Sequence, residues 1–170
     1  MILIGIGSNL AAPPFASPLD TASAALAQLP ELGIRVARRS RWYLTQPMPP
    51  SDQPWYANGV AAVESALAPA ELLRSLLALE VRFGRRRSIR NAARSLDLDL
   101  LDYDGRQCRN GRLTLPHPRL HERRFVLAPL VEIAPDWRHP LLRVSARELL
   151  ARLPPGDPVC ALGDPATPRR

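Results

Sequence analysis

Clusters of proline interrupt this 170-residue chain at three places and limit where helices and central strands can lie. Residues 45–56, TQPMPPSDQPWY, contain four prolines in twelve positions, so they can form neither a helix nor a central strand. A second cluster surrounds LPHPR at 115–119, and a third covers 154–170, where five of 17 residues are proline. We predict a rigid loop, a turn and a loosely attached tail at these places.

The first half of the chain alternates between strand and helix patterns. An apolar run at 2–6 that ends in Gly-Ser-Asn predicts a strand and a turn. Ser17, followed by proline, predicts the start of a helix that runs to about Leu29. Residues 34–44 alternate like a half-exposed strand, and 58–64 predict another strand.

The second half repeats this alternation. Pro69 begins a predicted helix with an apolar face at helical spacing. That face consists of Leu72, Leu76, Leu79 and Phe83. A strand is predicted at 95–103, an apolar segment at 125–133, and a last helix, with a Ser…Glu capping box, at 145–152.

The order of strand, helix, strand, strand, helix and strand is the split βαβ arrangement of ferredoxin-like folds. We therefore predict an α+β protein with a βαββαβ core, in which helices flank a mostly antiparallel sheet. The length suits one domain, which we place at 1–153, followed by a flexible tail at 154–170.

All 23 basic residues are arginine, and the formal net charge is +7. The lack of lysine excludes a Walker-type phosphate lysine and a Schiff-base lysine. The basic balance favours an anionic partner without choosing among nucleotide, nucleic acid and lipid. The two cysteines lack metal-ligand spacing, and the sequence has neither a membrane-span pattern nor a signal-peptide pattern, so we expect a cytoplasmic enzyme.

The stretch SLDLDLL at 95–101 places two aspartates on one face of a predicted strand. Because side chains alternate along a strand, Asp97 and Asp99 point the same way while the leucines face the core. Neighbouring carboxylates repel, and a cation relieves that repulsion. Mg²⁺ suits the pair because it takes oxygen ligands and completes its shell with water and phosphate. The alternative is a strand face whose acids pair with nearby arginines.

Five arginines lie in the ten residues just before the acidic pair. They are Arg85, Arg86, Arg87, Arg90 and Arg94. Guanidinium groups can bind phosphate oxygens in pairs, so the segment predicts a polyphosphate site. The alternatives are a solvated basic loop or an RNA-contacting patch, although a nucleic-acid module more often interleaves aromatic residues with the basic ones.

Tyr56 and Asn58 are candidates for a pocket that binds a heterocycle. An amide offers a donor and an acceptor, and an aromatic ring offers a stacking face. The alternative is that both residues are structural. His117, fixed between two prolines and near several arginines, is a candidate phosphate contact, although a lone histidine is more often structural.

Together these segments resemble the 6-hydroxymethyl-7,8-dihydropterin pyrophosphokinases of folate biosynthesis. The resemblance spans most of the chain and rests on four stretches in order. They are GIGSNL, DQPWYANGVAAVESALAPAELLRSLLALE, GRRRSIRNAARSLDLDLLDYDG and RLTLPHPRLHERRFVLAPLVEIAPDW. The resemblance implies a ferredoxin-like α+β fold, transfer of pyrophosphate from ATP to a pterin hydroxymethyl group with release of AMP, and two Mg²⁺ ions.

The resemblance also implies roles for individual residues. The catalytic residues would be Arg85, Arg94, Asp97 and Asp99, with Asp97 and Asp99 as the metal ligands. The pterin site would be Thr45, Gln46, Met48, Tyr56, Asn58 and Phe125, with the two aromatic rings on either side of the pterin. The ATP site would be Glu80, Arg94, Leu100, Arg112, Thr114, His117 and Arg123.

The chain departs from the family pattern before the acidic pair. Members commonly have Arg-Trp-Gly-Pro-Arg there, whereas this chain has RNAAR at 90–94, with Asn91 in place of the tryptophan. Gln46 also replaces a frequent proline, and Pro118 replaces a frequent aromatic residue or arginine.

Two other functions remain open from the residues alone: another Mg²⁺-dependent Asp-x-Asp nucleotidyl or glycosyl transferase, and a basic RNA-binding module. The resemblance favours small-molecule partners, ATP and a pterin, with no nucleic acid and no membrane, and a monomer.

Overall fold

A computed structural model describes residues 1–47, 52–85, 93–111, 113–155 and 159–162. Its main sheet has the strand order β5-β1-β4-β3-β8, and β2 also pairs with β4. The strands of this sheet are β1 (Ile2–Ser8), β2 (Ile34–Arg39), β3 (Tyr43–Thr45), β4 (Tyr56–Ser65), β5 (Asp97–Tyr103) and β8 (Cys160–Ala161). A separate hairpin consists of β6 (Cys108–Asn110) and β7 (Leu113–Leu115).

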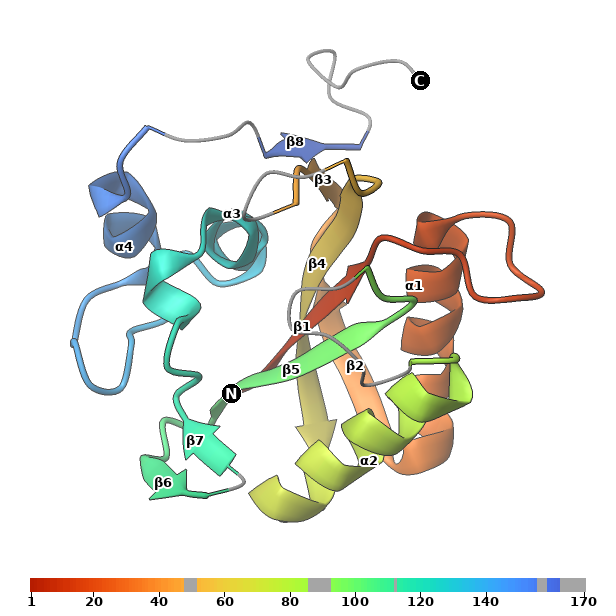
Figure 1. The fold of residues 1–170 in the computed structure, drawn as a ribbon. Coiled ribbons are helices and arrows are strands. Elements are labelled where there is room, and N and C mark those ends of the chain that lie inside the picture. The colour runs from red at the N-terminus through yellow and green to blue at the C-terminus, as the bar shows by residue number, and fades with distance from the viewer. Residues whose placement is uncertain (48–51, 86–92, 112, 156–158, 163–170) are drawn as a thin grey trace.

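Helices cover both faces of the main sheet (Figure 1). On one face lie α1 (Pro18–Gln28) and α2 (Pro69–Arg82), and on the other lie α3 (Arg124–Ile133) and α4 (Ala146–Arg152). Short 3-10 helices, η1 (Leu29–Leu32) and η2 (Leu120–Glu122), precede β2 and α3. None of the described helices is long and apolar enough to span a bilayer.

The predicted α+β fold with a ferredoxin-like core is confirmed. The element order β1, α1, β2–β3, β4, α2, β5 matches the predicted order, and β1 pairs antiparallel with both β4 and β5. Local signals formed as predicted: the Ser17 hydroxyl accepts a hydrogen bond from the Asp20 amide at the start of α1, and the capping box is present at α4.

Two hydrophobic clusters fill the space between the sheet and the helix layers. Ile2, Ile4 and Ile6 of β1 pack toward α1 and α2, together with Leu98 and Leu100 of β5 and the leucines of α2. Leu3 and Leu101 belong to the cluster on the α3 and α4 side. This alternation follows from the period of two along a strand, and it leaves the acidic residues of β5 on the α3 side.

The strand predicted at 34–44 is two strands, because the ladder is interrupted between Arg39 and Tyr43. At Ser40 the backbone amide still donates to the Val60 carbonyl at 2.9 Å, while the Ser40 hydroxyl accepts the Val60 amide at 3.1 Å. Beyond it, the ring of Trp42 covers Gly59, where an added Cβ would lie 3.1 Å from the indole. The chain then rejoins β4 as β3.

The C-terminal stretch is attached at one point that the sequence did not predict. Cys160–Ala161 pairs with β3, and the Leu162 amide donates to the Trp42 carbonyl at 2.7 Å. These residues are therefore attached to the sheet, while the flexible tail at 154–170 stays a prediction. A two-residue strand carries too little pattern to be recognised without its neighbour. The domain boundary at 153 stays a prediction.

Candidate active site

Asp97 and Asp99 lie on β5 with their side chains on the sheet face that α3 covers. Leu98 of β5, and Leu96 just before the strand, are buried on the opposite side, as the alternation predicted. Across the ladder, β1 places Gly7 beside Asp97 and Gly5 beside Asp99. Because glycine has no side chain, the side chains of Asn58 and Leu101 approach β1 closely here: an added Cβ at Gly7 would lie 2.9 Å from Asn58 Oδ1, and one at Gly5 would lie 3.5 Å from Leu101.

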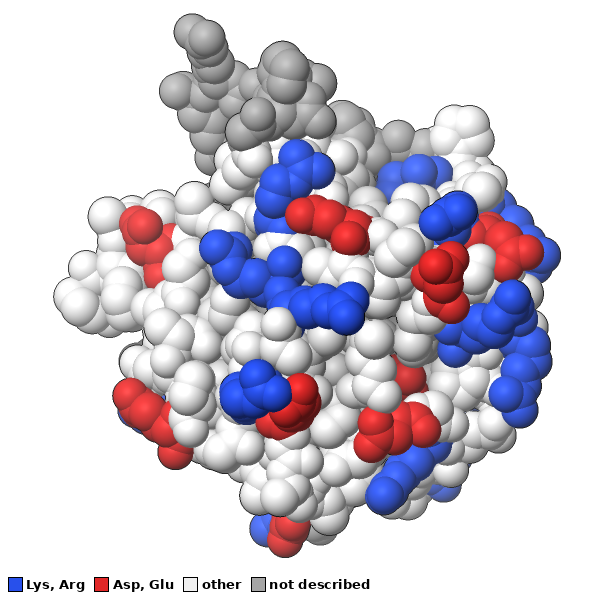
Figure 2. Space-filling view, turned by 180° about the vertical axis from the view of Figure 1, so that it is seen from behind, with Lys and Arg blue, Asp and Glu red and all other residues white. Residues whose placement is uncertain are grey.

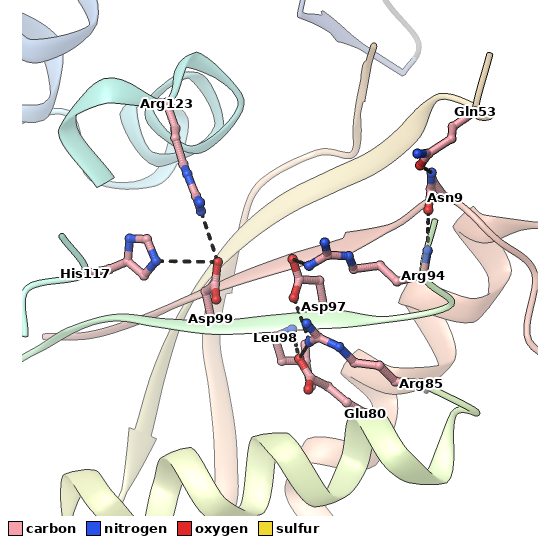
Figure 3. Close-up of polar contacts among 10 residues, drawn as sticks. All are labelled: Asn9, Gln53, Glu80, Arg85, Arg94, Asp97, Leu98, Asp99, His117 and Arg123. Atoms are coloured by element: carbon pink, nitrogen blue, oxygen red, sulfur yellow. Dashed lines mark hydrogen bonds and ion pairs between the residues drawn. The ribbon is translucent and has the colours of Figure 1, made fainter. Parts of the chain in front are cut away.

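Arginines from three separate segments converge on this pair (Figure 3). Asp97 accepts hydrogen bonds from Arg85 Nη1 at 2.7 Å and from Arg94 Nη1 at 3.0 Å. Asp99 accepts one from Arg123 Nη1 at 3.3 Å. The alternative interpretation predicted that the acids pair with arginines, and these ion pairs are present. A polyanion bound beside the acids would contact the same arginines.

His117, the candidate phosphate contact, lies next to Asp99. Its Nε2 is 4.0 Å from an Asp99 carboxylate oxygen, and its backbone amide donates to the Leu101 carbonyl at 2.8 Å. Burial lowers the pKa of His117, while burial and the neighbouring Asp97 charge raise the pKa of Asp99. Both shifts favour the neutral forms, which is the response expected when charges share a partly desolvated site.

Glu80 of α2 fixes the position of Arg85. The Glu80 side chain is 1% exposed, and its Oε1 accepts the Leu98 amide at 2.7 Å and an Arg85 guanidinium N–H. Burial raises the pKa of Glu80 to about 7. Through these two hydrogen bonds the Glu80 side chain holds Arg85 against Asp97 and links α2 to β5.

A second part of the site is formed by β3, β4 and the start of β5. The buried Asn58 donates from Nδ2 to Thr45 Oγ1 at 2.6 Å. An added Cβ at Gly7 would stand 2.9 Å from Asn58 Oδ1 and 4.0 Å from the Tyr56 ring. Burial raises the pKa of Tyr56, and the nearby Arg94 charge opposes that shift. The two pocket candidates thus lie beside the acidic pair.

Phe125 lies at the start of α3, where the Arg123 guanidinium stacks over its ring at 5.5 Å. The same Arg123 reaches Asp99, so the aromatic candidate and the acidic pair are connected through one side chain. The placement of a ring between Tyr56 and Phe125 stays a prediction.

The remaining candidates have different surroundings. The Leu100 side chain is buried in the core on the α1 and α2 side, so only its backbone is left for a contact with ATP. Gln46 is half-buried just after β3, and Thr114 is half-buried on β7. Met48 and Arg112 lie outside the described residues, as do Arg86, Arg87, Arg90 and Asn91.

The donor set fits Mg²⁺ only with help from a substrate. Within the described ranges, no three or more His, Cys, Asp or Glu side chains cluster as a metal site. Mg²⁺ is commonly bound by one or two carboxylates plus substrate phosphates and water, and Asp97 and Asp99 provide those two carboxylates. The residues therefore fit a metal that binds together with a phosphorylated substrate.

Sequence reasoning missed the role of the turn after β1. The resemblance implies that the pterin pocket lies beside this turn, but no residue of Gly7-Ser8-Asn9 was predicted as a site residue; yet an added Cβ at Gly7 would lie 2.9 Å from Asn58 Oδ1, and Asn9 is fully buried. The available signal was a polar residue directly after a buried strand, which is weak without knowing what packs on it.

Comparison with known proteins identifies the relatives of this chain. Residues 3–135 match the family model of 7,8-dihydro-6-hydroxymethylpterin-pyrophosphokinase (HPPK). The chain is 45% identical over 139 residues to the 2-amino-4-hydroxy-6-hydroxymethyldihydropteridine pyrophosphokinase of Synechocystis, covering 81% of this chain and 68% of the relative. It is 42% identical to the enzyme of the same name from Methylorubrum extorquens, covering 89% and 92%.

Solved structures agree on the fold. The HPPK-DHPS A437G protein of Plasmodium falciparum aligns with a TM-score of 0.67 at 12% identity, over 88% of this chain and 44% of that chain. This chain therefore spans less than half the length of that solved protein.

A ferredoxin-like fold that presents two carboxylates among arginines defines the class, an enzyme of phosphoryl-group transfer. More particularly, the chain belongs to the 7,8-dihydro-6-hydroxymethylpterin-pyrophosphokinase family. It is an ATP-dependent enzyme of folate biosynthesis, and the predicted reaction is confirmed at this level.

Proposed function

We propose that this site transfers the β,γ-pyrophosphoryl group of ATP to the hydroxymethyl oxygen of 6-hydroxymethyl-7,8-dihydropterin, with Asp97 and Asp99 as the ligands of two Mg²⁺ ions. The observation that supports these residue roles is the acidic pair held by Arg85, Arg94 and Arg123. Bound Mg²⁺ would neutralise phosphate charge and polarise the reacting phosphoryl group.

In this proposal the hydroxymethyl oxygen attacks the β-phosphorus, the bond from the β-phosphorus to the α–β bridging oxygen breaks, and AMP leaves with that oxygen. Arg85 and Arg94, now paired with Asp97, would turn to phosphate oxygens and stabilise their charge in the transition state. His117 and Arg123 stand on the Asp99 side and would contact the phosphates or the leaving group.

On the pterin side, Asn58 would bind the polar edge of the ring, and Tyr56 and Phe125 would stack on its two faces. Thr45 supports this assignment because its hydroxyl fixes the Asn58 amide at 2.6 Å. Gln46 would complete the rim. The rest of the ATP site would consist of Glu80, through its hold on Arg85, the Leu100 backbone and Thr114.

The alternative functions have less support. On the face behind the view of Figure 1, acidic side chains lie among the basic ones (Figure 2), so this face lacks the continuous basic patch of an RNA-binding surface. The other Asp-x-Asp transferases would not need the pocket of Tyr56 and Asn58. We further propose a monomer that binds only these small-molecule partners; its cytoplasmic location stays a prediction.

Product analysis tests the proposal. The purified protein is mixed with Mg-ATP and 6-hydroxymethyl-7,8-dihydropterin, and the nucleotides are separated. We expect pterin-dependent AMP in equal amount to pterin pyrophosphate. ADP would instead indicate transfer of the γ-phosphoryl group, and released pyrophosphate would indicate nucleotidyl transfer; either product contradicts the proposal.

A further inference from the structure

Asn9 is a fully buried polar residue at the point where three segments of the site meet. It directly follows β1, and its side chain lies between the end of the proline-rich loop and the residues that lead into β5 (Figure 3). A buried amide is costly unless its donors and its acceptor are satisfied, so its presence here requires an explanation.

The Asn9 side chain joins two loops that are far apart in the sequence. Its Nδ2 donates to Gln53 Oε1 at 3.1 Å and to the Pro54 carbonyl at 3.3 Å. Its Oδ1 accepts the Arg94 amide at 2.8 Å, and its own backbone amide donates to the Arg94 carbonyl at 3.1 Å. An asparagine amide suits this place because it donates on one side and accepts on the other.

Each loop carries a different half of the site. Pro54 is two residues before Tyr56, at the start of β4, so one arm of the Asn9 amide leads to the candidate pterin pocket. The other arm, Oδ1, accepts the Arg94 amide, while the Asn9 backbone amide donates to the Arg94 carbonyl; the Arg94 guanidinium reaches Asp97 Oδ2 at 3.0 Å. A shift of either loop would therefore change the geometry of both arms.

We propose that Asn9 is a positioning residue that couples the pterin side of the site to the phosphate side: it sets the Arg94 guanidinium for pyrophosphoryl transfer and, through Gln53 and Pro54, the pocket of Tyr56 and Asn58. This inference rests on the proposed function. Asn9 touches neither the acidic pair nor the aromatic candidates through any contact described above, so it acts through its two neighbours.

Two mutant cycles test the two arms separately. If Asn9 acts on transfer through Arg94, Asn9→Ala should lower kcat about tenfold or more, and adding it to Arg94→Ala should lower kcat hardly further. If it acts on the pocket through Gln53, Asn9→Ala and Gln53→Ala should each raise the pterin KM about fivefold, and the double variant should raise it no more than the larger single change.

Ser8→Ala is the matched control. Ser8 is equally buried, next to Asn9 at the end of β1, and among the described residues its hydroxyl donates to the Leu10 carbonyl at 3.1 Å without reaching either loop. It should lower thermal stability by an amount similar to Asn9→Ala while leaving kcat and the pterin KM within about twofold of the unmodified enzyme. If Asn9→Ala does not fold, Gln53→Ala still has to raise the pterin KM.

The outcomes separate the two proposals. Additive losses in both cycles, or equal kinetic losses in Ser8→Ala and Asn9→Ala, would overturn the positioning role while the enzyme still forms AMP. No pterin-dependent AMP from the unmodified protein would overturn the proposed function and this inference together.

Discussion

At the scale of single residues, the site depends on the glycines of β1 as well as on the acidic side chains of β5. Gly7 is the clearest example, because it faces Asp97 in the ladder and an added Cβ would stand 2.9 Å from Asn58 Oδ1. A methyl group here cannot be accommodated unless Asn58 moves away from Thr45.

Gly7→Ala is therefore expected to raise the pterin KM about tenfold, with a smaller effect on the KM for ATP. Steady-state kinetics with each substrate varied in turn would measure this. Gly5→Ala is the comparison, because its added Cβ would meet Leu101 at an ordinary contact of 3.5 Å. Equal effects of the two substitutions on the pterin KM would argue against the role of Asn58.

Asp97→Ala is expected to lower kcat by about two orders of magnitude or more, because it removes a proposed metal ligand. Stability should change little, since the side chain is partly exposed on a polar face and Arg85 keeps its contact with Glu80. Product formation and thermal unfolding would be measured beside Asp104→Ala, an exposed acid just past the same strand. Near-normal turnover would remove Asp97 from the metal site.

At the scale of elements, the connection between α3 and α4 is organised by a buried histidine. His139 is 2% exposed, and its Nδ1 accepts the amides of Leu141 and Leu142, both at 3.2 Å. Burial lowers the pKa of His139 to about 4. A proton on Nδ1 would face two N–H donors, so the turn requires the neutral ring.

Stability should therefore fall in mild acid. Because the pKa of His139 is about 4 in the folded protein and near 6.5 when unfolded, the unfolded chain takes up the proton first. The contribution of the neutral His139 ring to the free energy of unfolding is complete above pH 6.5 and is lost as the pH falls toward 4. Between pH 6.5 and pH 5 the loss is about 2 kcal/mol. Urea unfolding of the parent and His139→Gln at several pH values would show this; parallel pH curves would exclude His139 as the cause.

At the scale of the whole molecule, the C-terminal strand closes the sheet edge next to the candidate pterin site. β8 pairs with β3, and β3 carries Thr45. Truncation after Pro155 should therefore lower the free energy of unfolding by about 1 kcal/mol and raise the pterin KM modestly. Truncation after Leu162 keeps β8 and should leave the free energy of unfolding and the pterin KM unchanged. Identical behaviour of the two truncated proteins would show that β8 contributes nothing.

The sequence by itself determined most of the elements, their order and the placement of the two acids on one strand face. Helix starts at Ser17 and Ser145, the alternation that puts Asp97 and Asp99 on one face, and the proline-rich breaks are local properties, set by neighbouring residues and by backbone geometry. The ferredoxin-like fold followed from that order because few topologies accommodate it.

Only the tertiary structure decided which distant residues meet. The contact of Glu80 with the Leu98 amide, the approach of Arg123 to Asp99, and the Asn9 link between two loops join residues that lie far apart in the sequence. Such contacts depend on strand register and on helix packing across the sheet, and a local sequence pattern carries neither. The same reason explains why β8 was missed, since a two-residue strand exists only through its partner.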